Sequence, residues 1–593
     1  MDVFVVDGIV WVGSDYKGYD VQTGRLVRDL NWKGAPVAMA HHRCYRNKAT
    51  ERFILTGRAG VEVVSLEDGW QGNNSWIRGT CQYGIMPGNG LLYAPPDACA
   101  CFPKVKLSGF FAAAPQRGAD GRMPFPEKPV LEKGPAYGKP TSAAPPSVDD
   151  WPMYRHDATR SGRTPARVQP ALRKRWSATV DAGLTQPVIV GETMLVASTD
   201  THTLHALGTD GGEALWSYTA GARIDSAPTV YKGRVFFGSR DGWVYSLRAS
   251  DGRLAWRFRA APRAWQVGVL DQLESVWPVH GAVLIQNDTL YVTAGRSTYL
   301  DGGIVLYRLD PDTGEQLSRT VLYDLDPDTG RQTGFEPGRG FDMEGATSDV
   351  LSGDGESVFM KHLHFDASGQ PSEEEKPHLF CITGFLGEEW FVRSYWLIGT
   401  DVGAGWGGWA RSANQVPAGR ILCFDADRLY GYGRKEVASG PAGHKLDAYH
   451  LFATPKVLTS TKPAPRRTKA RGKANAGAKQ TPRLANARRP DLWSDDESLV
   501  VRAMVLTSDA LIVAGPPDLG RKESALLAFK NESEALAGFR GDKGVFLRVV
   551  SPTDGRKLSQ YKLGAMPVFD GMSAAAGCVY VATRNGTVEC WGP

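Results

Sequence analysis

The sequence has few of the features that mark membrane, fibrous or disordered proteins. Its 593 residues contain no run of about 18 apolar residues, the length that a membrane-spanning helix needs. Segments with a helical period of apolar residues are scarce. Hydrophobic residues make up 42% of the chain and charged residues 22%, which are ordinary values for a globular protein. These observations exclude a coiled coil, a collagen-like chain and wholesale disorder, and they argue against an integral helical membrane protein.

The chain also has little net charge of either sign. It carries 69 basic and 64 acidic residues, which gives a net charge of +5. The segment 461–490 holds ten Lys and Arg residues and no Asp or Glu, so the net charge without it is −5. A specific nucleic-acid partner is therefore not predicted for the protein as a whole. The segment itself predicts disorder, either as a tether for a polyanion or as a solvated surface insertion.

The N-terminus shows no signal peptide. Residues Met1–Val5 have no basic stretch, and they already have the pattern of a β-strand. Either the protein is cytoplasmic, or its leader is not part of this sequence.

Short alternating apolar runs separated by Gly and Asp turns dominate the chain and predict an all-β fold. Two consecutive segments, Leu184–Trp216 and Asp225–Trp256, repeat each other, and each holds four short strand-like runs. The tryptophans that end them are 40 residues apart. Four strands in about 40 residues make one blade of a β-propeller. Similar Asp and Gly turns recur near residues 20–24, 310–314, 326–330 and 553–555.

Weaker copies of the repeat extend along the chain, near residues 36–70, 78–112, 270–322, 342–425, 498–560 and 565–593. With the two clear copies they predict a single propeller of about eight four-stranded blades, with about seven to nine allowed. The copy Met566–Trp591 has too few strands for a whole blade. We therefore expect the N- and C-terminal strands to close the ring, with the strand near Val3–Val12 completing the last blade.

This pattern divides the chain into three parts. Residues 1–113 are predicted to form the first blades of the propeller. Residues 114–150 are rich in Pro, Gly and Ala and predict a flexible linker. Residues 151–593 are predicted to form the remaining blades, interrupted by the basic insert 461–490.

The repeat resembles that of PQQ-like, or quinoprotein-type, β-propellers. The motif is Asp-x-x-Thr-Gly-x-x-Leu-Trp after a short strand that ends in Ala-Leu, and its copies cover most of the chain. Trp151–Gly162, His41–Thr50 and Cys99–Cys101 resemble segments of uncharacterised exported proteins of planctomycete-type bacteria. The resemblance implies a periplasmic or secreted protein, while a cytoplasmic location stays open. Sharing the repeat does not imply sharing the cofactor, because fold is not function.

The resemblance gives little support to PQQ as a cofactor. Dehydrogenases of this type hold PQQ beside Ca²⁺ and carry a ring formed by two adjacent cysteines. The chain has eight cysteines and no adjacent pair, since Ala100 separates Cys99 from Cys101. The Ca²⁺ ligands have no recognisable motif here. A PQQ-dependent dehydrogenase is therefore the least favoured function.

In a propeller, the loops before the innermost strands and the turns between second and third strands gather on one face, around the channel. We predict a polar and aromatic funnel there. The predicted ligand-binding residues are His41, Gln186, Asp225, Glu274, Asp342, Glu344, Arg393, Tyr395, Trp406, Trp409, Arg502 and Asp570. The predicted catalytic residues are His42, Arg43, Arg78 and Tyr83, which we expect near Trp406 or Trp409.

Two further functions fit such a funnel. The first is binding of a small-molecule or polysaccharide ligand, with lyase-type elimination: aromatic rings stack on sugars, an arginine neutralises a uronate, and His42 or Tyr83 removes a proton. Asp342 and Glu344 would instead suit hydrolysis. The second is a non-catalytic platform for protein partners, which the lack of a sharp catalytic motif favours.

A metal site and a disulfide compete for one group of residues. His41, His42, Cys44, Cys81, Cys99 and Cys101 fall within 61 residues. Imidazole and thiolate ligands suit zinc or copper, whereas calcium prefers oxygen ligands. The spacing matches no zinc-finger motif, and in an exported protein a disulfide such as Cys44–Cys81 is the alternative. The remaining cysteines are predicted to be core residues, namely Cys381, Cys423, Cys578 and Cys590.

Overall fold

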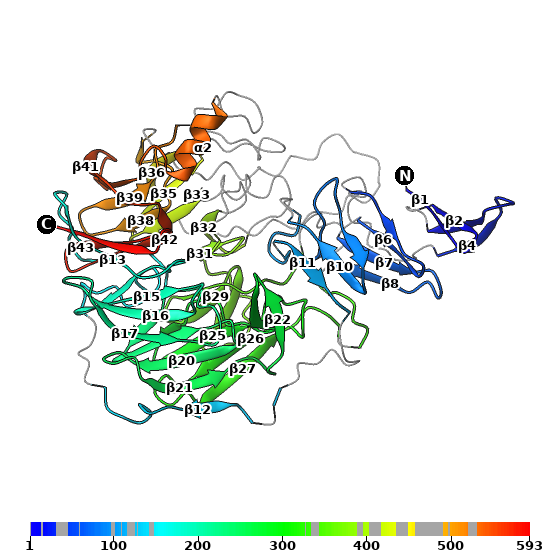
Figure 1. Ribbon diagram of the computed structural model, residues 1–593, viewed down its shortest axis with the longest axis horizontal. Helices are drawn as coiled ribbons and strands as arrows, with labels where there is room; N and C mark the ends of the chain where they lie inside the picture. The colour runs from blue at the N-terminus through cyan, green and yellow to red at the C-terminus, as the bar shows by residue number, and fades with distance from the viewer. Residues whose placement is uncertain are drawn as a thin grey trace, which may run out of the picture.

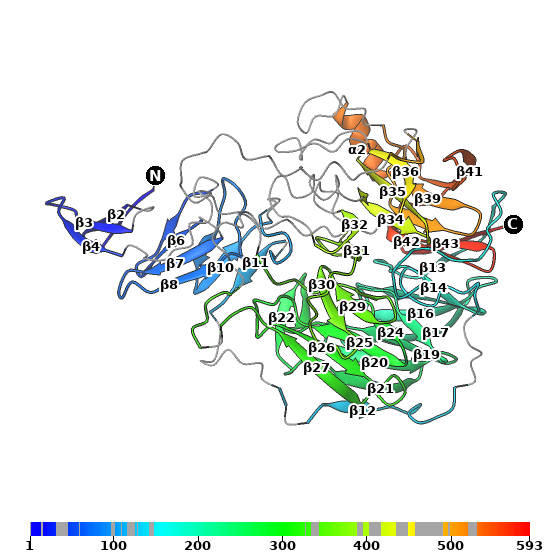
Figure 2. The same ribbon diagram turned by 180° about the vertical axis from the view of Figure 1, so that it is seen from behind.

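The fold is all-β, and its antiparallel sheets are arranged as the blades of a β-propeller (Figures 1 and 2). The computed structural model describes residues 2–12, 16–30, 45–57, 60–96, 101–107, 109–115, 125–126, 128–141, 147–326, 328–333, 343–387, 395–401, 417–434, 449–456, 490–495, 499–519 and 531–593. Among these residues, the helix α2 (Glu532–Arg540) is capped by Asn531, whose side chain accepts a hydrogen bond from the Glu534 amide at 3.0 Å. In this described part, no helix is long and apolar enough to span a membrane.

Eight of the described sheets follow one another between residues 173 and 593, and we number them 1 to 8. Sheet 1 contains β14 (Val188–Val190), β15 (Thr193–Ser198), β16 (Thr203–Gly208) and β17 (Ala214–Thr219), and sheet 2 contains β18 (Thr229–Tyr231), β19 (Arg234–Gly238), β20 (Trp243–Arg248) and β21 (Leu254–Arg259). Sheet 3 contains β24 (Leu284–Gln286), β25 (Thr289–Ala294), β26 (Ile304–Leu309) and β27 (Gln316–Leu322), and sheet 4 contains β28 (Leu351–Gly353), β29 (Ser357–Met360) and β30 (Leu363–Asp366).

The second half of the series is less regular. Sheet 5 contains β31 (His378–Cys381), β32 (Trp396–Gly399) and β33 (Ala418–Gly419), and sheet 6 contains β34 (Ile421–Phe424), β35 (Arg428–Arg434), β36 (Tyr449–Pro455) and β37 (Trp493–Asp495). Sheet 7 contains β38 (Ala503–Leu506), β39 (Leu511–Gly515), β40 (Phe546–Val550) and β41 (Lys557–Lys562). Sheet 8 contains β42 (Pro567–Ala575), β43 (Cys578–Thr583) and β44 (Thr587–Gly592), joined by β13 (Arg173–Thr179).

The burial of the strands follows from their place in a sheet. The second strand of sheet 2, Arg234–Gly238, is buried along its whole length because neighbouring sheets cover both of its faces. The outermost strand of sheet 1, Ala214–Thr219, instead alternates between exposed and half-buried residues. A strand covered on both faces carries a continuous apolar run, whereas an outer strand keeps an alternating pattern. The two patterns explain why the second strands gave the clearest apolar runs in the sequence.

A tryptophan on the outer strand of one sheet docks on a turn of the next sheet. Trp216 of β17 donates its indole N–H to the Ala249 carbonyl in sheet 2 at 2.9 Å. Its ring covers Gly252, where an added Cβ would lie 2.4 Å from the ring and where φ is +68°. Both features demand glycine. The same bond recurs between Trp176 and Thr209, Trp256 and Pro311, and Trp493 and Pro552.

A strand from the middle of the chain completes sheet 8. β13 pairs with β44 from Arg173 opposite Gly592 to Thr179 opposite Thr587. The prediction that Val3–Val12 completes the last blade is therefore wrong. The N-terminal strands instead form a sheet of their own. Among the described strands, β1 (Val3–Val6), β2 (Ile9–Val12), β3 (Lys17–Asp20) and β4 (Leu26–Asp29) pair only with one another.

Two further sheets precede residue 114 and lie with the first to one side of sheets 1 to 8 (Figures 1 and 2). They contain β5 (Lys48–Ala49), β6 (Phe53–Thr56), β7 (Val61–Ser65) and β8 (Gln71–Asn74), and β9 (Met86–Gly88), β10 (Leu91–Ala94) and β11 (Phe111–Ala113). Trp76 stacks on Tyr299 of sheet 3, with ring centroids 6.5 Å apart. The Thr347 amide donates to the Lys104 carbonyl at 3.1 Å. These contacts attach the N-terminal sheets to sheets 3 and 4.

The predicted linker 114–150 is not wholly without secondary structure. β12 (Leu131–Lys133) pairs with β21 and adds a fifth strand to sheet 2. The Gly134 and Ala136 amides continue this contact by donating to the Ala255 and Leu254 carbonyls, at 2.7 and 2.9 Å. Here the unpaired edge of β21 supplies hydrogen-bonding groups that a composition rich in Pro and Gly does not reveal. The basic insert 461–490 lies outside the described residues, apart from Pro490.

Candidate functional site

The segment Trp151–Gly162 crosses the axis around which the sheets are arranged. Its backbone bonds to an inner strand of five different sheets. The amides of Val230, Gly353, Phe424 and Leu506 donate to carbonyls of the segment, and Trp151 exchanges two bonds with Ile189. These partners lie in or next to β18, β28, β34, β38 and β14. A segment that reaches all five sheets must lie at their common centre, so the chain itself occupies this part of the axis.

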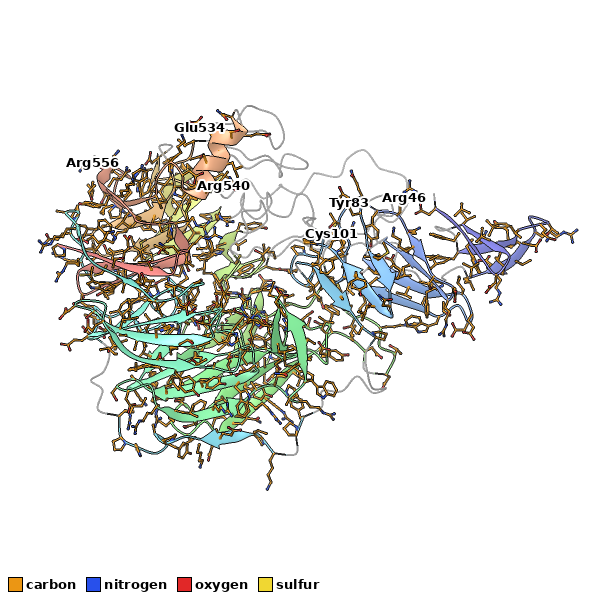
Figure 3. All side chains as sticks on the ribbon, viewed as in Figure 1. Arg46, Tyr83, Cys101, Glu534, Arg540 and Arg556 are labelled. Carbon is orange, nitrogen blue, oxygen red and sulfur yellow. The ribbon has the colours of Figure 1, made fainter. Side chains whose placement is uncertain are left out.

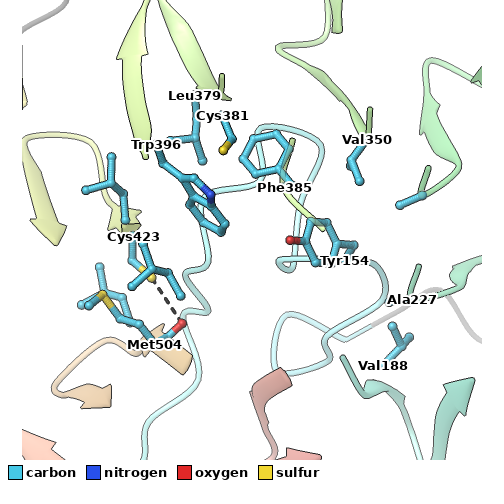
Figure 4. Close-up of a cluster of buried hydrophobic side chains, with 14 of the residues drawn as sticks. Tyr154, Val188, Ala227, Val350, Leu379, Cys381, Phe385, Trp396, Cys423 and Met504 are labelled. Atoms are coloured by element: carbon cyan, nitrogen blue, oxygen red, sulfur yellow. Dashed lines mark hydrogen bonds between the residues drawn. The ribbon is translucent and has the colours of Figure 1, made fainter. Parts of the chain in front are cut away.

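Arg155 is the centre of this axial segment. Its side chain is fully buried and pairs with Asp570, with 2.7 Å between Nη1 and Oδ1. Its Nε donates to the Arg160 carbonyl at 2.8 Å, and Nη2 donates to the Leu422 carbonyl. The guanidinium carbon lies 4.5 Å from the centre of the Trp396 ring. Figure 4 shows the apolar side chains of this centre, with Tyr154, Phe385 and Trp396 close together.

Two predicted ligand-binding residues belong to this buried network. Gln186 accepts a bond from the Arg155 amide at 2.6 Å and donates to the Asp570 and Met572 carbonyls. Gln186 is 4% exposed and Asp570 is 2% exposed. Burial raises the pKa of the Asp570 carboxyl, and the charge of Arg155 opposes that rise. Both side chains therefore hold the axial segment in place.

Five charged residues beside sheets 2 and 3 meet in a group that we name the mouth cluster: Arg223, Asp225, Arg240, Glu274 and Arg296. Arg240 lies between the two carboxylates. It donates through Nε to Asp225 and through Nη1 to both Glu274 oxygens, at 3.0 and 3.1 Å. Arg223 approaches Asp225 at 3.3 Å, and Arg296 approaches Glu274 at 2.9 Å. Three arginines thus share two carboxylates.

The electrostatics of the mouth cluster follow from this arrangement. The Glu274 side chain is fully buried, whereas those of Arg223, Arg240 and Arg296 keep 17%, 20% and 24% of their surface exposed. Burial lowers the pKa of the Arg240 guanidinium, but the negative charges of Asp225 and Glu274 raise it by more, so that the pKa lies above its ordinary value. Burial, followed by the charge of Arg240, lowers the pKa of nearby His280 to about 4. The cluster therefore presents a net positive charge at neutral pH.

Beside the cluster, a two-stranded hairpin formed by β22 (Gln266–Val269) and β23 (Gln272–Ser275) pairs with no other described strand. His202 of sheet 1 contacts Gln272 at 2.7 Å, and the Ser275 amide donates to the Arg240 carbonyl at 2.7 Å. The hairpin therefore rests on the turns of sheets 1 and 2. We define the hairpin surface as the exposed residues Arg263, Trp265, Val267, Leu270 and Leu273.

This hairpin surface is unusually apolar for an exposed element. Leu270 is 71% exposed, Leu273 is 61% exposed and Trp265 is 46% exposed. The guanidinium of Arg263 lies 5.2 Å from the centre of the Trp265 ring. Trp and Arg are the residues that most often dominate the binding energy of protein interfaces. An isolated hairpin with apolar side chains on both faces is typical of a contact site for a partner.

Of the remaining predicted ligand-binding residues, those that the structure describes do not join the mouth cluster. Arg502 donates to the Pro567 carbonyl at 2.9 Å, and burial followed by the charge of Arg584 lowers its pKa to about 10. Tyr395 is buried, and Glu344 is exposed, with its carbonyl accepting the Tyr299 hydroxyl at 2.6 Å. His41, Asp342, Arg393, Trp406 and Trp409 lie outside the described residues.

Of the four predicted catalytic residues, the structure describes Arg78 and Tyr83. Tyr83 is 78% exposed and belongs to the N-terminal sheets (Figure 3). Arg78 is 1% exposed, with its guanidinium carbon 5.9 Å from the centre of the Tyr45 ring. An exposed ring and a buried guanidinium do not face one ligand together. His42 and Arg43 lie outside the described residues.

The predicted metal or disulfide group is likewise incomplete. Cys81 is exposed and Cys101 is buried, while His41, His42, Cys44 and Cys99 lie outside the described residues. Within the part of the chain that is described, no three side chains of His, Cys, Asp or Glu gather as metal ligands would.

The arginines of the mouth cluster were missed although the repeat carried a signal for them. Arg240 and Arg296 each stand two residues after the end of a second strand, β19 and β25. Equivalent positions in successive repeats lie at equivalent places on the same face. Comparing these turns across the repeats would have placed both guanidinium groups beside the predicted carboxylates Asp225 and Glu274.

Comparisons with known proteins agree with the repeat. Residues 160–329 match a family model described as outer membrane protein assembly factor BamB. No curated protein matches the chain. Among solved structures, BamB from Moraxella catarrhalis is 12% identical, with a TM-score of 0.37, and the match covers 71% of this chain and 98% of that chain.

Two quinoprotein structures also match. Quinohemoprotein alcohol dehydrogenase from Comamonas testosteroni is 14% identical, with a TM-score of 0.46, over 75% of this chain and 81% of that chain. A europium-containing methanol dehydrogenase is 12% identical, with a TM-score of 0.45, over 75% of this chain and 98% of that chain. The repeat motif and the matched family model are both consistent with a PQQ-like repeat protein.

Proposed function

We propose that the protein is a non-catalytic β-propeller that binds an acidic segment of a partner protein at the hairpin surface and the adjacent mouth cluster. The observation that carries the proposal is the exposed group of Arg263, Trp265, Leu270 and Leu273 beside three arginines that share two carboxylates. Apolar side chains supply the contact area, and the positive charge selects an acidic partner. The matched family model, described as an assembly factor, supports a role in protein interaction.

The same proposal includes a ring of eight blades, one for each of sheets 1 to 8. Its support is a series of contacts between strands of neighbouring sheets, which runs from sheet 5 through sheets 8 and 1 to sheet 4. β14 contacts β18, β18 contacts β24 and β24 contacts β28; β32 contacts β34, β34 contacts β38, β38 contacts β42, and β42 contacts β14. In this arrangement β13 is the closing strand, and residues 1–113 form a separate unit that packs beside the ring. A family named for the outer membrane supports a location in the periplasm.

Catalysis is the weaker alternative. The axial residues pair with one another, and Asp225 and Glu274 are held by arginines instead of presenting free carboxylates. The described residues at the axis also do not fit PQQ, because Trp151, Arg155 and Arg160 fill their part of it with fully buried side chains. A lyase acting on acidic sugar would need its base and its arginine on one surface, which Tyr83 and Arg78 do not share.

A binding titration with two probes tests the proposal. The first probe is a labelled peptide of alternating Glu and Phe, and the second is an oligogalacturonate. The full chain is expected to bind the peptide, with weaker binding at high salt. Combined Leu270→Ser and Leu273→Ser substitutions should weaken this binding roughly tenfold, because each truncation removes an apolar contact. Leu215→Ser is the matched control, since Leu215 is 49% exposed on the outer strand of sheet 1.

Two outcomes would overturn the proposal. Binding of the sugar but not of the peptide would favour the carbohydrate function. Peptide binding that is as strong for the Leu270 and Leu273 variant as for the Leu215 control would remove the hairpin surface from the site.

A further inference from the structure

Two cysteines stand on one face of sheet 8, the sheet that β13 completes. Cys590 on β44 pairs in register with Tyr580 on β43, and Val579 pairs with Trp591. Cys578 begins β43, two residues before Tyr580, so it projects from the same face as Tyr580 and Cys590. The two cysteines are diagonal neighbours on adjacent strands. Cys590 is buried, whereas Cys578 is half-buried and within reach of solvent.

Gly592 makes room for the sulfur of Cys578. A Cβ atom added at Gly592 would lie 2.7 Å from Cys578 Sγ, which is too close for two atoms that are not bonded. It would lie in ordinary van der Waals contact with two side-chain carbons of Arg175, at 3.5 and 3.6 Å. Arg175 is the extra residue of a bulge in β13, between Lys174 opposite Trp591 and Trp176 opposite Cys590. Because Gly592 has no Cβ, the Cys578 sulfur and the Arg175 side chain can both pack over this position of β44.

The surroundings make the two thiols unequal. A hydrogen bond with Cys590, supported by the charge of Arg175, lowers the pKa of the Cys578 thiol to about 7, while burial and the charge of Asp210 act in the opposite direction. The same hydrogen bond and burial raise the pKa of Cys590. A half-exposed thiol with thiolate character beside a second cysteine is the arrangement of a reactive cysteine and its resolving partner.

We propose that Cys578 and Cys590 form a reversible dithiol–disulfide site that reacts with small organic disulfides. In the first step, the Cys578 thiolate attacks one sulfur of the small disulfide; the mixed disulfide forms, and one small thiolate leaves. In the second step, Cys590 loses its proton to solvent and attacks the Cys578 sulfur, which releases the second small thiolate. The two cysteines are oxidised by two electrons, and the small disulfide is reduced to two thiols.

The backbone geometry makes the bond a labile one. Diagonal neighbours on paired strands have Cα atoms about 7–8 Å apart, slightly beyond the usual span of a disulfide of about 4.4–6.8 Å. Closure must therefore draw the beginning of β43 towards the end of β44. Cys578 follows the tight turn at Ala576 and Gly577, so the beginning of β43 can yield. Disulfides closed under strain are the readily reduced ones.

The test exposes the full chain to hydroxyethyl disulfide at pH 7 and follows intact mass and peptide maps under non-reducing conditions. In the peptide map of the wild-type chain, the peptides of Cys578 and Cys590 should become linked and together two hydrogens lighter, and thiol treatment should reverse the change. Cys590→Ser should stop at a stable mixed disulfide on Cys578, and Cys578→Ser should form neither product. Cys423→Ser is the matched control, because Cys423 is fully buried and burial raises the pKa of its thiol to about 11.

The rate gives a second readout. A lower pKa increases the thiolate fraction at pH 7 more than it decreases nucleophilicity, so Cys578 should react roughly threefold faster than an ordinary thiol. The proposal is overturned if Cys578 reacts no faster than Cys423, or if wild-type chain and Cys590→Ser give the same stable mixed disulfide. Loss of folding in a cysteine variant would show as a changed melting curve, and the wild-type mass shift still decides the proposal in that case.

Discussion

Replacing Arg155 with methionine should destabilise the whole ring, because this one side chain joins the axial segment to sheets 6 and 8. The substitution keeps an apolar stem of similar length and removes the guanidinium. Asp570, which is 2% exposed, would lose its partner at 2.7 Å and remain buried. The carbonyls of Arg160 and Leu422 would lose their donor as well.

The size of the effect follows from the isolated carboxylate. Removing one partner of a buried ion pair costs about 3–5 kcal/mol. Each carbonyl left without a donor adds about 1 kcal/mol or more. Part of this cost can be relieved by protonation of Asp570, whose pKa burial already raises. We therefore expect a loss of about 4 kcal/mol in the free energy of unfolding, and a melting temperature lower by about 5 °C or more.

Thermal unfolding followed by tryptophan fluorescence measures this loss, and a double variant separates charge from packing. Arg155→Met with Asp570→Leu removes both charges, so it should be more stable than Arg155→Met alone, since replacing a whole buried pair by apolar groups is far less costly than breaking it. The reasoning is refuted if Arg155→Met melts with the wild type, or if the double variant loses the sum of the two single losses.

Three other changes test separate parts of the structure. Deleting residues 2–12 should leave the melting temperature of sheets 1 to 8 unchanged, whereas replacing Trp176 on β13 with alanine should lower it by several degrees, as differential scanning calorimetry would show. Gly252→Ala should cost about 1–2 kcal/mol for its left-handed backbone alone, with more from its contact with Trp216; Gly268→Ala, where nothing lies within 4 Å, is the control in urea unfolding. Burial raises the pKa of Asp349 to about 6, so this carboxyl stabilises the native state at pH 4 and that contribution is lost as the pH rises to 6. The stability difference between wild type and Asp349→Asn should therefore change by up to about 3 kcal/mol over this range, and a constant difference would contradict the assignment.

The repeat itself could be predicted from the sequence, and so could the strand β13 that completes sheet 8. The turn motif and the 40-residue spacing of Trp216 and Trp256 identified sheets 1 and 2 correctly, because each tryptophan must dock on a glycine turn. Trp176 stands 40 residues before Trp216 and makes the same bond to a carbonyl of the next sheet. That spacing marked β13 as an outer strand without its own blade. The prediction chose Val3–Val12 because strand pairing across a long separation leaves no local signal.

The candidate site was harder to predict because its groups pair across sheets. The sequence singled out Asp225 and Glu274, but it could not show that Arg240 lies between them. Gln186 and Asp570 come from equivalent loops and are nevertheless buried, because the axial segment covers them. The hairpin β22–β23 breaks the repeat, so periodicity gave no expectation for its exposed Trp265, Leu270 and Leu273.

The central claim is that the protein binds a partner at the hairpin surface. Hydrogen exchange of the full chain, with and without the Glu and Phe peptide, tests it most directly. Among the described strands, β22 and β23 form a ladder only with each other, so their outward amides exchange readily in the free protein. The account predicts that the peptide protects amides of residues 263–275 and leaves those of the N-terminal sheets near Tyr83 unchanged. Protection near Tyr83 with none in residues 263–275 would contradict it.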